Sequence, residues 1–201
     1  MTASSAPHNP EIPGYNFGSS EVAQSPLSAE DLLHLEQTVG WTTADEQLLR
    51  KHAALFEAQA EHMVDSWRAV IGAQPHLAQW FVGPDGQPDD VYKARIKRRF
   101  VQWVVDVATR PHDRAWLNYQ EEIGLRHTPK KKNKTDSRHT PPVVPLRYLW
   151  AFVPTVTEVR NFFESAISDP AELAALERAW TKVVHLHVVL WTRPYTSEGL
   201  W

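Results

Sequence analysis

The chain has 201 residues, nine tryptophans, no cysteine and a formal net charge of −3. The lack of cysteine excludes disulfides, thiolate metal sites, iron–sulfur clusters and haem attached through cysteine, and the charge argues against nucleic-acid binding. No apolar run approaches the ~20 residues of a membrane-spanning helix. We therefore expect a cytoplasmic protein that binds neither nucleic acid nor a membrane.

The N-terminal third combines a polar start with helical patterns. Residues 1–11 are expected to be a disordered tail, whereas Ile12–Gly18 mixes turn formers with apolar residues and predicts a docked arm. Ser28 is a candidate N-cap of a short helix. A capping box over Thr43–Glu46 predicts a long helix, whose apolar stripe is Leu49, Phe56, Ala60, Met63, Trp67 and Ile71.

The rest of the chain also shows helical periodicity. We expect a short helical piece over 76–81, a helix over 89–109 and a helix from the N-cap Asp113 to His127. Residues 128–142 form a loop whose basic run, Lys130–Lys134, is expected to be solvated. Pro145 begins a helix that extends to Phe163, and the last helix runs from the N-cap Asp169 to Arg193–Pro194. No alternating β pattern appears, so residues 12–201 are expected to form a single all-α domain of seven or eight helices.

His127 has the most informative position among the ten histidines. It ends a helix whose apolar face includes Trp116 and Ile123, and it precedes a basic loop. A helix end that delivers an imidazole into an apolar pocket can supply the protein ligand of a haem iron, and the many aromatic residues suit a flat apolar ligand. On this pattern alone, such a histidine is more often a hydrogen-bonded core residue.

Several segments in one register closely resemble the protoglobins, single-domain globins related to the haem domains of globin-coupled sensors. The resemblance runs from Ile12 to the C-terminus. It rests on Ile12–Tyr15, Trp67, Lys97–Phe100, Trp116–His127, Lys131–Asn133, Thr135–Asp136, Arg147–Leu149, Ala151–Phe152, Trp191 and Pro194–Tyr195. It implies a globin fold with an additional N-terminal helix and arm, a buried haem b (iron protoporphyrin IX) and a homodimer. Val184, Val188, Trp191 and the helix start at Pro145 are the expected dimer contacts.

The resemblance also assigns roles to individual residues. It implies that His127 is the proximal iron ligand. Arg99 is expected near a haem propionate, which a guanidinium can bind through two parallel hydrogen bonds. The other expected haem contacts are Trp67, Arg68, Ile96 and Phe100 on the distal side, and Ile123, Leu149, Phe152 and Val156 around the pocket. For the aliphatic and phenylalanine positions, ordinary core packing is the alternative.

The sequence departs from the family at Arg68, where the protoglobins have a tyrosine after the tryptophan. An arginine is permanently charged and donates up to five hydrogen bonds. One hypothesis is that Arg68 reaches over the iron and favours ligands of anionic character, such as bound O2, cyanide, nitrite or peroxide. The alternative is that it turns to a propionate, a carboxylate or water, because burial of an unpaired charge costs several kcal/mol, roughly.

The resemblance favours a haem protein that reversibly binds O2, CO and NO at an open distal site. One alternative is a haem enzyme with peroxidase-like activity or activity against reactive nitrogen or oxygen species, although the expected pocket lacks a histidine or carboxylate as general base. Another is a gas sensor that acts through a separate partner. We do not expect His185 and His187 to bind a metal together, because residues two apart on a helix point in nearly opposite directions.

Overall fold

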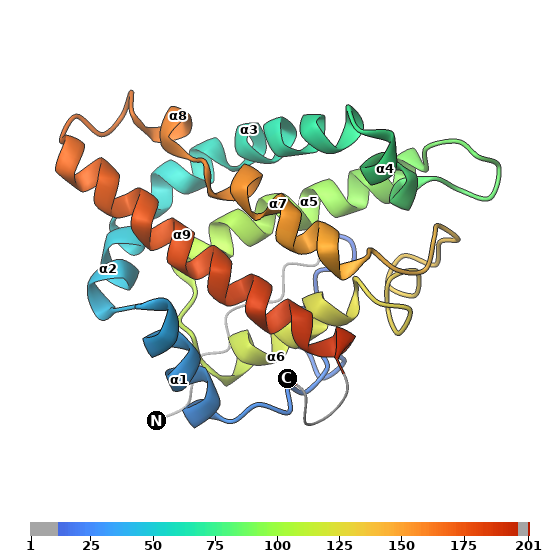
Figure 1. Ribbon diagram of the computed structural model, residues 1–201, viewed down its shortest axis with the longest axis horizontal. Coiled ribbons are helices and arrows are strands. Elements are labelled where there is room, and N and C mark those ends of the chain that lie inside the picture. The colour runs from blue at the N-terminus through green and yellow to red at the C-terminus, as the bar shows by residue number, and fades with distance from the viewer. Residues whose placement is uncertain (1–11, 197–200) are drawn as a thin grey trace.

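The computed structural model describes residues 12–196 and Trp201, and this part of the chain is helical without a β-strand (Figure 1). The expected tail, residues 1–11, lies outside it. The elements are α1 (Ala29–Val39), α2 (Thr43–Lys51), α3 (Ala53–Gly72), α4 (Pro75–Ala78), η1 (Gln79–Phe81), α5 (Asp90–Thr109), α6 (Arg114–Leu125), α7 (Leu146–Thr157), α8 (Arg160–Phe163), α9 (Pro170–Thr192) and η2 (Arg193–Tyr195). The all-α class is confirmed. None of these helices has the length and apolar character needed to cross a membrane.

The long C-terminal helix α9 organises the molecule. It packs against α1, α2, α6, α7 and α8, and Figure 1 shows it crossing the molecule diagonally. Helices α3 and α5 pack on one another and lie side by side in both views. Because α9 is surrounded by other helices, Val184 and Val188 are buried inside the monomer, with 1% and 4% of their surface exposed. The expectation that these two valines contact a second copy is therefore wrong.

Local chemistry explains most helix boundaries and corrects three of the expected ones. The capping box of α2 lies one residue earlier than expected, with Thr42 as the N-cap and Asp45 as its partner. The expected long helix is divided at His52, whose backbone departs from helical geometry. The helix expected to reach Phe163 ends at Thr157, where the C-cap residue Glu158 turns to an extended conformation.

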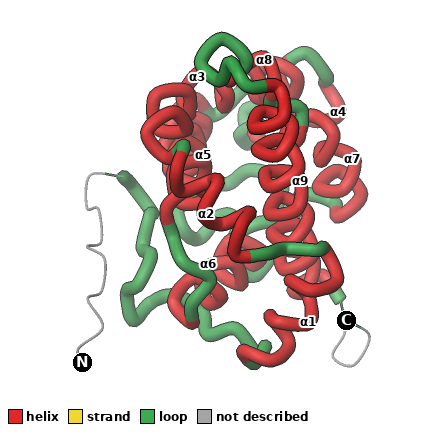
Figure 2. The backbone as a smooth tube through the Cα atoms, turned by 90° about the vertical axis from the view of Figure 1, so that its left-hand side faces the viewer, coloured by secondary structure: helices red, strands yellow, loops and turns green. Residues whose placement is uncertain are grey.

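The N-terminal arm is docked as expected. The Tyr15 hydroxyl donates to Asp106 over 2.6 Å, and Tyr15 is almost completely buried. Arg99 donates to the carbonyl of Pro13 over 2.7 Å. Gly14 has a φ of +75°, and a Cβ atom there would lie only 2.6 Å from Nη1 of Arg99. Glycine is therefore required where the arm crosses this arginine, and the arm then continues toward α1 along one side of the molecule (Figure 2).

The basic loop is solvated only in part: Lys130 and Lys134 are exposed as expected, whereas Lys131 is partly buried and Lys132 is buried. Lys132 is only 3% exposed, and its ammonium donates to the Trp80 carbonyl over 2.9 Å and to the Thr140 hydroxyl over 2.7 Å. Burial lowers the pKa of Lys132 to about 8. Lys131 pairs with the buried carboxylate of Glu122 on α6. The expectation fails at Lys131 and Lys132 because these two lysines find acceptors inside the fold, and their charges attach the loop to the helices.

Candidate functional site

His127 lies just beyond the end of α6, and the contacts of its ring define which nitrogen carries the hydrogen. Its Nδ1 is 2.8 Å from the carbonyl oxygen of Ile123, one helical turn earlier. Because a carbonyl only accepts, Nδ1 must carry the hydrogen, and the lone pair of the neutral ring is on Nε2. Burial lowers the pKa of His127, which keeps the ring neutral. A neutral imidazole whose other nitrogen donates to a carbonyl is the usual form of a metal-ligating histidine.

The backbone of His127 is fixed by segments from elsewhere in the chain. Its carbonyl accepts from the amide of Val144 over 2.9 Å and lies 3.1 Å from the hydroxyl of Tyr195. The same hydroxyl lies 2.6 Å from the carbonyl of Val144. At Gly124, a Cβ atom would lie 3.0 Å from the Trp191 carbonyl. The glycine therefore allows α6 to approach the end of α9 closely, which positions His127.

Aromatic rings of α9 lie against the ring of His127. Trp191 stacks on it, with ring centroids 6.0 Å apart and planes 21° apart, and its Nε1 donates to Gln120 over 2.9 Å. His187 stacks on Trp191 at 5.6 Å. Neither residue is among the site residues predicted from the sequence. Their four-residue spacing on one helix is the signal that could have placed them on a shared face.

Two predicted distal residues form an aromatic wall on α3 and α5. The rings of Trp67 and Phe100 are 5.4 Å apart. Trp67 is 2% exposed, and its Nε1 finds no hydrogen-bond partner among the described residues. Trp103 connects this wall to the other side, because its ring lies 5.5 Å from Phe100 and 5.7 Å from Trp191. The structure therefore brings the predicted distal wall and the surroundings of His127 to the same part of the core.

The remaining predicted apolar contacts come from α5, α6 and α7. Val156 is buried, whereas five apolar side chains keep part of their surface exposed: Ile96, Phe100, Ile123, Leu149 and Phe152. Phe100, Ile123 and Phe152 pack against the main hydrophobic core. Partial exposure of apolar side chains on three different helices leaves apolar surface for a ligand to cover.

Arg68 lies beside the surface carboxylate of Asp65. Its Nη1 is 3.6 Å from Asp65 on the same helix, and its Nη2 is 3.5 Å from the Lys93 carbonyl on α5. Lys97 donates to the same Asp65 over 2.8 Å. The side chain of Arg68 is 26% exposed, and its two contacts are longer than a strong hydrogen bond. The position therefore resembles the outward alternative, in which the charge pairs with a carboxylate.

Arg99 is engaged in a bidentate ion pair. Its two terminal nitrogens lie 3.0 and 2.6 Å from the carboxylate oxygens of Asp136, and it also holds the arm at Pro13. Asp136 is 4% exposed, so the pair is a buried connection between α5, the arm and the basic loop. The predicted contact between Arg99 and a haem propionate stays a prediction.

These residues fit a haem. His127 offers Nε2 as an iron ligand, and the apolar side chains of three helices offer the flat surfaces that a porphyrin covers. The unpartnered N–H of Trp67 is a buried donor in the predicted distal wall, and such a group calls for an acceptor. Within the described residues, no cluster of three or more histidine and acidic side chains offers a separate metal site.

Comparison with known proteins relates this arrangement to a family. The family model for protoglobin matches residues 28–201. None of the curated proteins matches the chain. Among solved structures, the chain is similar to the globin domain of a globin-coupled sensor from Geobacter sulfurreducens, with a TM-score of 0.65, 16% identity, and coverage of 82% of this chain and 97% of that domain. At this identity the likeness shows the fold, and it confirms the globin architecture.

Proposed function

Because the chain belongs to the protoglobin family, we propose that it binds O2, CO and NO reversibly at the iron of a haem held by His127. A globin domain implies a haem cofactor and gas binding. The haem supplies the iron that binds the gas, and the absence of cysteine favours a non-covalent haem b. The observation that supports His127 best is its ring, whose Nδ1 donates to the Ile123 carbonyl and so leaves the Nε2 lone pair for a metal.

The other predicted site residues have distinct proposed tasks. Ile123, Leu149, Phe152 and Val156 cover the apolar surface of the haem, and Ile96 and Phe100 exclude water from the gas. Exclusion of water slows the oxidation of ferrous iron. In the predicted distal wall, Trp67 provides a buried N–H that has no partner in the described part of the chain. We propose that it donates to the bound gas or to a water that the gas displaces.

A peroxidase-like activity is a second candidate function. The observation that favours it is that Trp191 stacks on His127 and lies 5.7 Å from Trp103, because adjacent indoles can give up electrons to a strong oxidant. The sensor alternative, the homodimer and the cytoplasmic location stay predictions. With Val184 and Val188 buried, Trp191 and the start of α7 at Pro145 are the remaining predicted dimer contacts, and both are partly exposed.

An absorption spectrum tests the proposed function. We expect the ferrous protein to show a five-coordinate Soret band that shifts with CO, and we expect His127→Ala to lose the band or change its coordination. His185→Ala is a matched control, because Nδ1 of His185 also bonds the carbonyl four residues earlier, at 2.7 Å, but on α9. A colourless protein that refuses added haemin would overturn the proposal, and so would an unchanged spectrum in His127→Ala.

A further inference from the structure

Six aromatic rings form a continuous stack that starts at His127 and ends at the surface. The series is His127, Trp191, His187, Trp116, His112 and Trp41, and consecutive ring centroids are 6.0, 5.6, 5.3, 4.0 and 5.2 Å apart. Indoles and imidazoles alternate along it. The rings come from the ends of α6 and α9 and from the two loops that precede α2 and α6, so the stack exists only in the folded chain.

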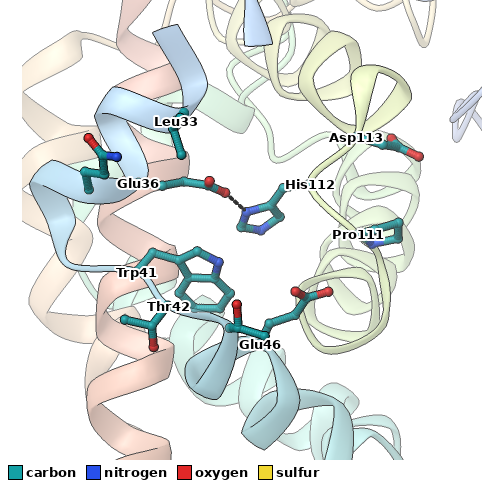
Figure 3. Close-up of a pocket in the computed structure, with 10 residues that line it drawn as sticks. Leu33, Glu36, Trp41, Thr42, Glu46, Pro111, His112 and Asp113 are labelled. Carbon is teal, nitrogen blue, oxygen red and sulfur yellow. Dashed lines mark hydrogen bonds and ion pairs between the residues drawn. The ribbon is translucent and has the colours of Figure 1, made fainter. Parts of the chain in front are cut away.

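The outer end of the stack opens into a surface pocket of about 550 Å³. Trp41 and His112 lie side by side in it, and the Glu36 carboxylate bonds Nδ1 of His112 at 2.6 Å (Figure 3). Glu46 and Leu33 also line the pocket. With Asp113, which also lines it, the pocket offers an aromatic face, an apolar side chain and three carboxylates within one opening.

A second branch joins the stack near its inner end. Trp103 donates from Nε1 to Nδ1 of His187 over 2.9 Å, and its ring lies 6.4 Å from Trp67 in the predicted distal wall. Because Nδ1 of His187 accepts, the hydrogen of this neutral ring is on Nε2, which is buried and has no hydrogen-bond partner in the described part of the chain. The Nε2–H of His187, between Trp116 and Trp191, is thus a buried donor without an acceptor among the described residues. Burial of such a group lowers the stability of the fold, so its presence calls for a functional reason.

The environment makes one end of the stack more favourable for a positive charge. A tryptophan that loses an electron becomes a cation, and a cation is costly in an apolar interior. Trp116 is 2% exposed, whereas Trp41 is partly exposed and shares the pocket with the carboxylates of Glu36 and Glu46. Solvent and these carboxylates stabilise the charge on Trp41. A charge created near His127 is therefore drawn outward.

We propose that this stack carries oxidising equivalents from the haem side of His127 to Trp41, where a phenol bound in the pocket replaces the lost electron. The inference rests on the proposed haem at His127. The oxidant is hydrogen peroxide. Electrons move inward along the stack, Trp41 becomes its radical cation, and the phenol gives it one electron while its hydroxyl proton leaves to solvent. Two such events supply the two electrons and two protons that turn one hydrogen peroxide into two waters, and two phenols become two phenoxyl radicals.

The lining of the pocket indicates why a phenol is the substrate class. Its ring can stack on Trp41, and its hydroxyl can donate to a carboxylate of Glu36 or Glu46. Stacking places the ring of the donor in contact with the outermost indole. Phenols are also easily oxidised aromatic compounds, whereas an anionic reductant would be repelled by the carboxylates that line the pocket.

Radical trapping tests the path with a readout that is independent of turnover. The haem-loaded protein is treated with peroxide and a nitroso spin trap without phenol, and the adduct is located by peptide mass spectrometry. In the wild-type protein we expect the adduct on Trp41. Trp116→Phe removes the middle indole and should abolish this adduct. Trp116→Tyr restores an oxidisable ring at the same position and should recover the adduct. Trp150→Phe is the control, because Trp150 is 42% exposed and lies outside the stack; it should leave labelling of Trp41 unchanged.

Each outcome supports or overturns the proposal. Equal labelling of Trp41 in the wild-type protein and Trp116→Phe would overturn it, and so would wild-type labelling that stays at Trp191. If Trp116→Phe does not fold, the surface variant Trp41→Phe decides: it should keep the CO spectrum but lose saturable phenol oxidation, and unchanged oxidation overturns the proposal. A protein that takes up no haem overturns the proposed function as well, whereas a haem-loaded, CO-binding protein without label on Trp41 overturns only the electron path.

Discussion

The two sides of the candidate haem site differ in how firmly their side chains are held by contacts. On the proximal side, the ring of His127 is held by the Ile123 carbonyl and by stacking on Trp191, and its backbone carbonyl is bonded by Val144 and Tyr195. On the distal side, Arg68 has contacts of only 3.5 and 3.6 Å and is partly exposed. Packing therefore orients the predicted iron ligand in advance, whereas the distal charge is held loosely near the carboxylate of Asp65.

We expect the strongest effect on the acid stability of the proximal side. Burial lowers the pKa of His187 well below 6.5, so the folded protein keeps it neutral while the unfolded chain takes up a proton below about pH 6.5. Because the unfolded state binds more protons there, stability is lost as the pH falls through this range, by up to about 1.4 kcal/mol per pH unit from this one group. Urea unfolding of the haem-loaded protein at pH 7 and pH 5 measures this loss.

The variant His187→Phe isolates that contribution. The substitution also removes the acceptor of the Trp103 N–H, so the variant should be less stable than the wild-type protein at pH 7. The free energy of unfolding that it loses between pH 7 and pH 5 should nevertheless be smaller than in the wild-type protein. Equal losses in the two proteins would show that His187 does not carry this acid sensitivity. The acid sensitivity would then be no evidence that the proximal side is tightly packed.

A smaller effect is expected from loosening the backbone of His127. Tyr195→Phe removes the hydroxyl that lies against the carbonyls of Val144 and His127, which should cost about 1 kcal/mol. We expect a matching rise in the rate of haem loss, roughly fivefold if the full cost falls on the haem-bound state. Transfer of haem to an acceptor globin measures that rate, with Tyr148→Phe as the control tyrosine on α7. A rate equal to that of the control would mean that Tyr195 does not support the iron ligand.

The smallest effect is expected on the distal side. Arg68 lies beside Asp65 and its side chain is partly exposed. Arg68→Leu should therefore change the dissociation rates of O2 and cyanide by no more than roughly twofold, which is the scale of a surface ion pair. Arg98→Leu, at an exposed position of α5, is the control for loss of one positive charge. A large acceleration in Arg68→Leu alone would contradict the outward position and support the hypothesis that Arg68 reaches the bound ligand.

Features that depend on neighbours along a helix could be predicted from the sequence. The helical stripes, the caps at Ser28 and Asp113, and the position of His127 at a helix end all follow from spacings of three or four residues. The bond from Nδ1 of His127 to Ile123 is of the same local kind. The resemblance to protoglobins rests on such segments in one register, and the family match confirmed it.

The tertiary structure alone decided where side chains meet partners far along the chain. The burial of Lys132, the pairing of Arg99 with Asp136, the outward contacts of Arg68 and the burial of Val184 inside the monomer each depend on another segment. The aromatic stack depends on loops that no periodic pattern describes. Local spacing specifies which face of a helix is apolar, but only the packing of that face decides which charge finds a partner and which ring lies against the next.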